Sequence, residues 1–263
     1  SDGTLTSQSE PDFEFSIPDF IINNVFEDRD KNIWWCSFDH GYRVTYAYKE
    51  RFGNNFLNTV LGGRSVIALD LSDDDRLFIA TVRDGIYTYR LDDGSFYPTP
   101  LRQGGKEFKN PYITGMEAQE GGYLWVATYK NIFLTRVSGR DLKVLHKWDV
   151  PLCLCLKGDD EGYVWAATNL GKLLRLGKDG SIREADLHIA PESYTYVGGI
   201  DILPSGNIIA STFGDGLYEI DRKTLSANHI DFSEEDWSRC ISRSLFIPSS
   251  ICIDSKGLVW LGT

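Results

Sequence analysis

The chain has 263 residues, of which 42% are apolar and 13% aromatic, and its formal net charge is −11. This composition can supply a large core, and an all-β chain of this size can form one domain. The acidic balance argues against binding to nucleic acid or to an anionic membrane surface, and no apolar run reaches the roughly 18–20 residues that span a bilayer.

A five-residue pattern recurs six times along the chain. It consists of an apolar residue, a large apolar anchor, an apolar residue, a small residue and, at its end, Ser or Thr, with some variation between copies. In chain order the copies are 33–37, 77–81, 124–128, 164–168, 208–212 and 259–263. The average step is about 45 residues, a period typical of the four-stranded blades of a β-propeller.

The flanks of the pattern predict tight turns. Three residues before the anchor stands Lys31, Asp75, Gly122, Gly162, Gly206 or Gly257. A second turn, with Gly or Asn131, follows the hydroxyl residue and leads into a third apolar run such as 85–89. Runs such as 95–97 and 144–148 supply a fourth strand.

We therefore predict an all-β fold, a β-propeller of four-stranded antiparallel blades with about six repeats. The expected units are 21–63, 64–109, 110–150, 151–193, 194–246 and a truncated 247–263, after an N-terminal segment, 1–20. In that segment, 13–17 is a candidate strand of a preceding or closing blade. We expect an incomplete ring or a fragment of a seven-bladed propeller, with a closed six-bladed ring as the alternative.

The pattern also has a mechanical interpretation. The large anchor fills the wedge between neighbouring blades, the small residue lets the next sheet approach, and the hydroxyl bonds a backbone group as the chain leaves the strand.

The cysteines and acidic runs predict no metal or cofactor. We expect the five cysteines, at 36, 153, 155, 240 and 252, to be free buried thiols, with Cys153 and Cys155 on one face of a strand. No Cys or His spacing is typical of zinc. The run 73–75 is expected to cap a turn rather than to hold calcium.

The repeat resembles the two-component regulator propeller repeat, in which Asp-x-x-Gly precedes a short strand of apolar residue, Trp, apolar residue, small residue and Thr. The segments 253–263 and 159–168 carry this pattern, and the other copies carry it in degenerate form. The second copy lacks the turn glycine, and the fifth has Ile209 in place of Trp and Leu203 in place of Asp.

The resemblance implies a non-catalytic, periplasmic, ligand-sensing module of a Bacteroides-type hybrid two-component sensor, with a glycan fragment as ligand. It further implies that the parent protein carries further blades, a transmembrane helix and a histidine kinase, and that the parent is a homodimer. Two alternatives stay open: a propeller lyase of the streptogramin-lyase type, which needs a His or acid pair at one mouth of the channel, and a protein-interaction scaffold.

A glycan site is expected where each outer strand leads into the next inner strand, because aromatic faces stack on sugar rings while charged and amide groups bind hydroxyls. A second candidate is the insertion 231–246, which makes the longest step between repeats. The candidate ligand-binding residues of these two places are Arg64, Asn110, Tyr112, Tyr194, Tyr196, Trp237, Arg239 and Arg243.

Overall fold

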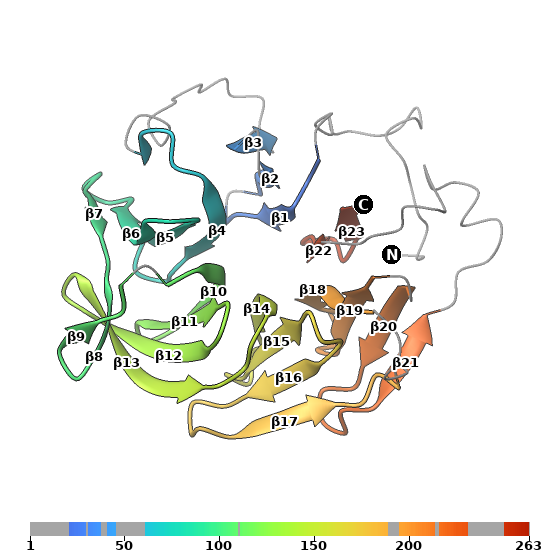
Figure 1. Cartoon of the computed structure of the whole chain (residues 1–263). Coiled ribbons are helices and arrows are strands. Elements are labelled where there is room, and N and C mark those ends of the chain that lie inside the picture. The colour runs from blue at the N-terminus through green and yellow to red at the C-terminus, as the bar shows by residue number, and fades with distance from the viewer. Residues whose placement is uncertain are drawn as a thin grey trace. The chain divides into compact units, whose positions relative to one another are not determined.

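The computed structural model describes residues 21–29, 31–37, 41–45, 61–109, 111–188, 195–213, 216–230 and 250–262. In this part of the chain nearly all regular structure is β-strand, and each of the six repeats forms one sheet (Figure 1). The predicted strand 13–17 lies outside the described residues. No helix among the described residues is long and apolar enough to cross a membrane. The chain divides into two compact units, residues 52–184 and residues 1–51 with 185–263.

The 52–184 unit contains three sheets. The first has the order β4 (Val66–Leu71), β5 (Arg76–Thr81), β6 (Gly85–Arg90), β7 (Phe96–Pro98). The next is built on β10 (Ile113–Gln119), β11 (Tyr123–Thr128), β12 (Ile132–Ser138) and β13 (Asp141–Trp148). The third has β14 (Cys153–Gly158), β15 (Val164–Thr168), β16 (Leu173–Leu176) and β17 (Ile182–Ala185). The strands β4 and β10 contact each other, as do β10 and β14, so successive sheets stack through their first strands.

A short hairpin that the sequence did not predict extends the middle sheet. Its strands are β8 (Leu101–Gln103) and β9 (Lys106–Glu107), and β8 pairs parallel to β13. Arg102 fixes this hairpin through Asp141, at 3.0 Å, and Glu107, at 3.3 Å.

The other unit contains the fifth, sixth and first repeats. Its sheets are β18 (Val197–Ile202), β19 (Ile208–Thr212), β20 (Gly216–Ile220) and β21 (Ala227–Ile230); β22 (Ser250–Ile253) and β23 (Val259–Gly262); and β1 (Asn24–Glu27), β2 (Ile33–Ser37) and β3 (Gly41–Thr45). The strand β22 contacts both β18 and β1, and the rings of Trp35 and Trp260 meet edge to face at 6.5 Å. The first and last repeats are therefore neighbours within this unit.

The anchor and the small residue behave as the sequence predicts in the third and fourth repeats, whereas the anchors Trp34 and Trp260 of the first and sixth repeats are only half-buried. Trp125 and Trp165 are fully buried, and so are the small residues Ala127 and Ala167 two positions later. Trp125 and Ala127 belong to a core cluster that includes Leu156 and Val164 of the next sheet. The bulky residue thus fills the space between two sheets, while the small residue permits their close approach.

The turn before each anchor explains the spacing of the motif. Asp159 accepts backbone N–H bonds from Glu161, at 3.0 Å, and Tyr163, at 2.9 Å, while its second oxygen accepts the indole N–H of Trp165, at 2.9 Å. The turn residue Gly162 has a φ of 85°, a conformation in which a glycine avoids the Cβ clash. We call the end of the sheets that carries these turns the aspartate end.

The same turn recurs in the other unit. Asp28 accepts the indole N–H of Trp34 at 2.8 Å, and Asp254 accepts that of Trp260 at 3.1 Å. Lys31 also has a positive φ, of 67°, so the first copy adopts the same backbone conformation without a glycine.

The hydroxyl residue closes the opposite turn, as predicted. The Oγ1 atoms of Thr81 and Thr128 donate to the carbonyls of Gly85, at 3.0 Å, and Asn131, at 2.9 Å. Thr212 does the same to Gly216 at 2.9 Å. We call this end of the sheets the hydroxyl end.

The prediction that Cys153 and Cys155 share a strand face is wrong. A β-bulge pairs Cys153 with Thr168 and Cys155 with Ala167, which are adjacent residues, so the two cysteines lie on opposite faces. The four cysteines in the described residues are free thiols, as expected, but only Cys153 and Cys252 are buried, whereas Cys36 and Cys155 are half-buried; Cys240 lies outside the described range. Burial raises the pKa of Cys36 to about 11 and that of Cys153 well above its ordinary value.

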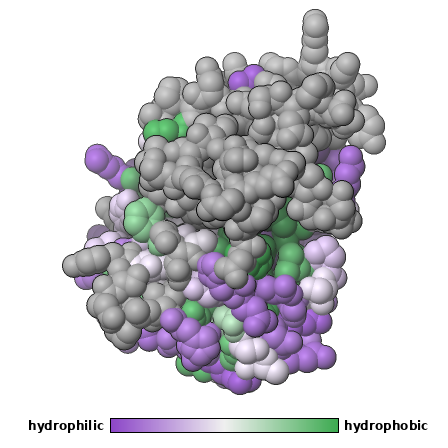
Figure 2. All heavy atoms as spheres, turned by 90° about the vertical axis from the view of Figure 1, so that its right-hand side faces the viewer, coloured by the Kyte–Doolittle hydropathy of each residue, from purple (hydrophilic) through white to green (hydrophobic). Residues whose placement is uncertain are grey.

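Hydrophilic residues cover most of the coloured surface on the face drawn in Figure 2, and apolar residues show in smaller patches between them. Such a surface is expected for an acidic chain in which many of the apolar residues are buried between the sheets.

Candidate functional site

The hydroxyl end of the 52–184 unit presents a pair of exposed tyrosines. Tyr112 lies just before β10, and Tyr129 just after β11, at the tip of the turn that Thr128 closes. The N–H of Tyr129 donates to the carbonyl of Tyr112 at 2.9 Å, which holds the two residues side by side. Their rings meet at 81° with centroids 6.3 Å apart, and the residues are 51% and 55% exposed. Both rings therefore keep surface available for a ligand.

The backbone continues this row into the next sheet. The N–H of Leu152 donates to the carbonyl of Tyr129 at 3.0 Å, and that of Asn169 to the carbonyl of Leu152 at 2.8 Å. The residue after Asn169 is Leu170, which is 58% exposed. We call Tyr112, Tyr129 and Leu170 the tyrosine platform.

Asn131, on the same turn as Tyr129, joins a group of polar residues at the end of β13. Asn131 donates its amide N–H to Asp149 at 2.7 Å, and Lys147 approaches the same carboxylate oxygen at 2.9 Å. The hydrogen bond from Lys147 lowers the pKa of Asp149, so this carboxylate is ionised at neutral pH. An amide, a carboxylate and an ammonium group thus meet at the hydroxyl end of the sheet that also carries the two aromatic rings. This combination can stack a flat apolar surface and bind hydroxyl groups around it.

Arg64 also lies at the hydroxyl end, as expected, but its guanidinium is already used. It pairs with Asp84 at 3.2 Å, donates to the carbonyl of Leu61 at 2.8 Å and lies over the ring of Tyr87. It therefore braces the turn of its own sheet rather than presenting a bare cation.

In the other unit, Tyr196 occupies the position that Tyr112 has in its sheet. Its carbonyl accepts the N–H of Phe213 at 2.8 Å, and the two rings stack at 5.0 Å with an interplanar angle of 10°. One face of Tyr196 is thus used for packing. The remaining predicted ligand residues, Asn110, Tyr194, Trp237, Arg239 and Arg243, lie outside the described residues.

The sequence interpretation missed Tyr129, Asn131, Asp149 and Leu170. A signal existed for the first of these: the residue directly after the hydroxyl is aromatic in three copies, at Phe38, Tyr129 and Phe213. Asp149 follows the fourth strand of its repeat, so only the folded sheet brings it beside Asn131.

A third group of polar residues lies on the first strands, between sheets. Asp70 on β4 accepts the backbone N–H of Ala118 on β10, and Glu117 accepts that of Gly158 on β14. In the other unit, Asp201 accepts the N–H of Ile253 on β22. These carboxylates occupy one repeat position, opposite the anchor, and link each first strand to the next.

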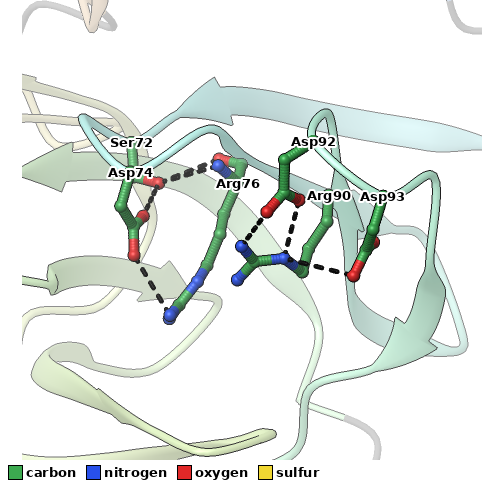
Figure 3. Close-up of polar contacts among 6 residues, drawn as sticks. All are labelled: Ser72, Asp74, Arg76, Arg90, Asp92 and Asp93. Atoms are coloured by element: carbon green, nitrogen blue, oxygen red, sulfur yellow. Dashed lines mark hydrogen bonds and ion pairs between the residues drawn. The ribbon is translucent and has the colours of Figure 1, made fainter.

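Neither the acidic run nor the histidines form a reactive centre in the described part of the chain. Asp74 accepts the hydroxyl of Ser72 at 2.6 Å and pairs with Arg76 at 3.1 Å (Figure 3). No group of three or more His, Cys, Asp or Glu residues able to hold a metal ion occurs among the described residues. His146 lies on β13 and His229 on β21, the fourth strands of their repeats, His188 pairs with Asp186 at 3.2 Å at an exposed position, and His40 is outside the described range.

Comparison with known proteins identifies the fold. No family model matches the sequence, and no curated protein is similar to it at a significant level. Among solved structures, the WD40 β-propeller domain of Doa1 is 16% identical, with a TM-score of 0.62, over 92% of this chain and 75% of that chain. Virginiamycin B lyase from Staphylococcus aureus is 12% identical, with a TM-score of 0.58, over 92% and 84%.

A third similar structure is the extracellular domain of the hybrid two component system BT4673 from B. thetaiotaomicron. It is 18% identical, with a TM-score of 0.54 over 92% of this chain. The present chain spans only 37% of the length of that domain. At these identities the likenesses show a shared fold, so the chain is an all-β protein of the β-propeller class, as the repeats predict.

Proposed function

We propose that this chain is a ligand-sensing, non-catalytic module from the extracytoplasmic part of a hybrid two-component sensor, built from two-component regulator propeller repeats. Two independent features support the proposal. The Asp-x-x-Gly-x-x-Trp turn has a complete structural role at Asp159 and Asp254. The fold is shared with extracellular domains of two such systems from B. thetaiotaomicron, at 18% and 14% identity.

The ligand under this proposal is an oligosaccharide, and the tyrosine platform carries the assignment. Two half-exposed rings at right angles offer surfaces for the apolar faces of sugar rings. Asn131, Asp149 and Lys147 supply donors and acceptors for hydroxyl groups at the same end of the sheet. Binding, rather than a lyase reaction, fits the positions of His146 and His229, since both lie on the fourth strands of their repeats.

Under this proposal the module acts in the periplasm and is joined to further blades of a longer parent protein. The membrane is reached through the parent's transmembrane helix, and a homodimer of the parent carries the signal to a kinase. These parts belong to the proposed parent protein.

Calorimetric titration of the chain with a panel of neutral oligosaccharides tests the proposal. We expect saturable binding of at least one member, and about fivefold weaker binding of that member by Tyr129→Ala, since stacking on an aromatic ring contributes about 1 kcal/mol. Leu91→Ala is the matched control, because Leu91 is 50% exposed but lies at the aspartate end. Failure of the whole panel to bind, or equal affinity of Tyr129→Ala and the parent chain, would contradict the proposed site. Chemical turnover of the bound sugar would contradict the non-catalytic role.

A further inference from the structure

The aspartate end of the 52–184 unit carries two positions at which cations stand directly opposite each other on neighbouring strands. In the first sheet Arg76 on β5 pairs in register with Arg90 on β6. In the middle sheet Arg136 on β12 pairs in register with Lys143 on β13. Like charges directly opposite one another in an antiparallel pair are destabilising, so each position needs a compensating negative charge.

The first position is compensated by side chains of its own sheet (Figure 3). Arg76 pairs with Asp74 at 3.1 Å, and Arg90 binds Asp92 and also approaches Asp93 at 3.8 Å. The hydrogen bond from Arg90 lowers the pKa of Asp92. Three carboxylates therefore balance these two guanidinium groups.

The second position has no such carboxylates within the described residues. Arg136 lies over the ring of Tyr123, its neighbour across the strands, at 5.4 Å. Lys178, from the turn before β17 in the next sheet, lies over the same ring at 4.5 Å. Among the described residues, no carboxylate forms an ion pair with Arg136, Lys143 or Lys178.

The nearest acidic residues in the sequence are bound elsewhere. Asp141 pairs with Arg102 at 3.0 Å, and Asp179 accepts the hydroxyl and the N–H of Ser181 at 2.6 Å and 2.9 Å. The seam between the middle and third sheets thus carries Arg136 and Lys178 over one tyrosine, with Lys143 opposite Arg136 on the neighbouring strand, in a chain with a net charge of −11. Arg136 and Lys143 are exposed and Lys178 is half-buried, so solvent reaches the cluster.

We propose that Arg136, Lys143 and Lys178 form a binding site for a tetrahedral oxyanion, a sulfate or phosphate group. A guanidinium donates two parallel N–H bonds to such a group, and ammonium groups add charge without fixed direction. A dianion compensates three neighbouring cations better than chloride does. The site lies at the aspartate end, whereas the tyrosine platform lies at the hydroxyl end, so this inference is independent of the proposed oligosaccharide site.

Thermal unfolding at constant ionic strength tests the site. Sodium sulfate, sodium phosphate or glucose 6-phosphate replaces sodium chloride in steps at the same ionic strength. General screening is therefore the same at every step. We expect a saturable rise in the melting temperature of the chain, with a midpoint in the millimolar range. If glucose 6-phosphate binds at least tenfold more tightly than inorganic phosphate, the bound oxyanion is part of a larger ester. If the midpoints of the two titrations are equal, the free ion is the ligand. Both results support the site.

The variants separate the site from general electrostatics. Arg136→Gln/Lys143→Gln should shift the midpoint at least tenfold, yet unfold at no lower temperature than the parent chain at low salt, because the opposed charges are gone. Arg90→Gln is the matched control, since its position is already compensated, and it should leave the midpoint unchanged. Lys178→Gln gives a second, single-site variant in a turn.

Two results would overturn the inference. One is the absence of any saturable rise with all three anions. The other is an equal rise in the parent chain and in both Arg136→Gln/Lys143→Gln and Lys178→Gln.

Discussion

Asp70 gives the sheet-to-sheet linkage a measurable pH dependence. Its carboxylate accepts the N–H of Leu71 at 2.8 Å and the N–H of Ala118 on the neighbouring sheet. Burial raises the pKa of Asp70 from 3.8 to about 6, although the two backbone hydrogen bonds and the charge of Lys157 act to lower it. The desolvation cost thus exceeds the stabilisation that the two N–H donors give to the charged form.

The direction of the effect on stability follows from this pKa. The folded state holds the proton more tightly than the unfolded state, so Asp70 contributes stability that is fully present below pH 3.8 and is lost as the pH rises through about 6. A difference of about two pKa units corresponds to roughly 3 kcal/mol. As the pH rises from below 3.8 to well above 6, we expect the loss of this contribution to lower the melting temperature of a chain of this size by about 6–12 °C.

The substitution Asp70→Asn removes the ionisation but keeps one acceptor oxygen. It should cost about 1 kcal/mol at low pH, because its amide N–H₂ faces one of the two backbone donors. As the pH rises, this cost should vanish, and Asp70→Asn should become more stable than the unsubstituted chain, since the asparagine is never charged.

Thermal unfolding of the parent chain, Asp70→Asn and Asp92→Asn between pH 4 and pH 8 measures the difference. Asp92 is the control, because its carboxyl is exposed and its pKa is lowered, so its substitution should add no pH dependence in this window. A difference between the parent chain and Asp70→Asn that stays constant from pH 4 to pH 8 would refute the assigned titration.

Three further predictions concern the turns and the thiols. Asp159→Ala should lower the free energy of unfolding in urea by about 1–3 kcal/mol, since three N–H groups lose their acceptor. Glu120→Ala, at an exposed residue in the preceding repeat, should change it by less than about 0.5 kcal/mol. Gly162→Ala should cost about 1–2 kcal/mol from the backbone alone, because a Cβ there would contact nothing but would be held at a φ of 85°. Cys153 should resist alkylation in the native protein and react after unfolding, as mass spectrometry of its peptide would show.

The repeat and the turn chemistry could be predicted because each depends on residues close together in the sequence. Asp159, Gly162 and Trp165 lie within seven residues, and their hydrogen bonds are local. The β-bulge could not be predicted in this way. It recurs at Ile67, Thr114, Leu154 and Gly198, four different residue types, because it is imposed by the pairing of the first strand rather than by the side chain.

The site was predicted less completely because its groups come from separate segments. The pairing of Arg64 with Asp84 depends on two turns at the same end of one sheet, 20 positions apart. The β8–β9 hairpin was missed for a similar reason, since the partner of Leu101 is Leu142 on the outer strand of the following repeat. Such contacts are set by the stacking of repeats and leave no local pattern.

The turns at the two ends of the sheets differ in how many of their residues can be substituted without loss of the turn. At the aspartate end, the turns of the first, fourth and sixth repeats are closed by a carboxylate, a residue with positive φ and an indole, as in Asp159, Gly162 and Trp165. At the hydroxyl end one threonine and the backbone close the turn, so the side chains at its tip take no part in closure. These tips are Val82 and Arg83 in the second repeat, Tyr129 and Lys130 in the third, and Asn169 and Leu170 in the fourth. Because the tip residues can change without loss of the fold, ligand specificity can be placed there at little cost in stability, which is the physical reason for assigning the oligosaccharide site to the tyrosine platform.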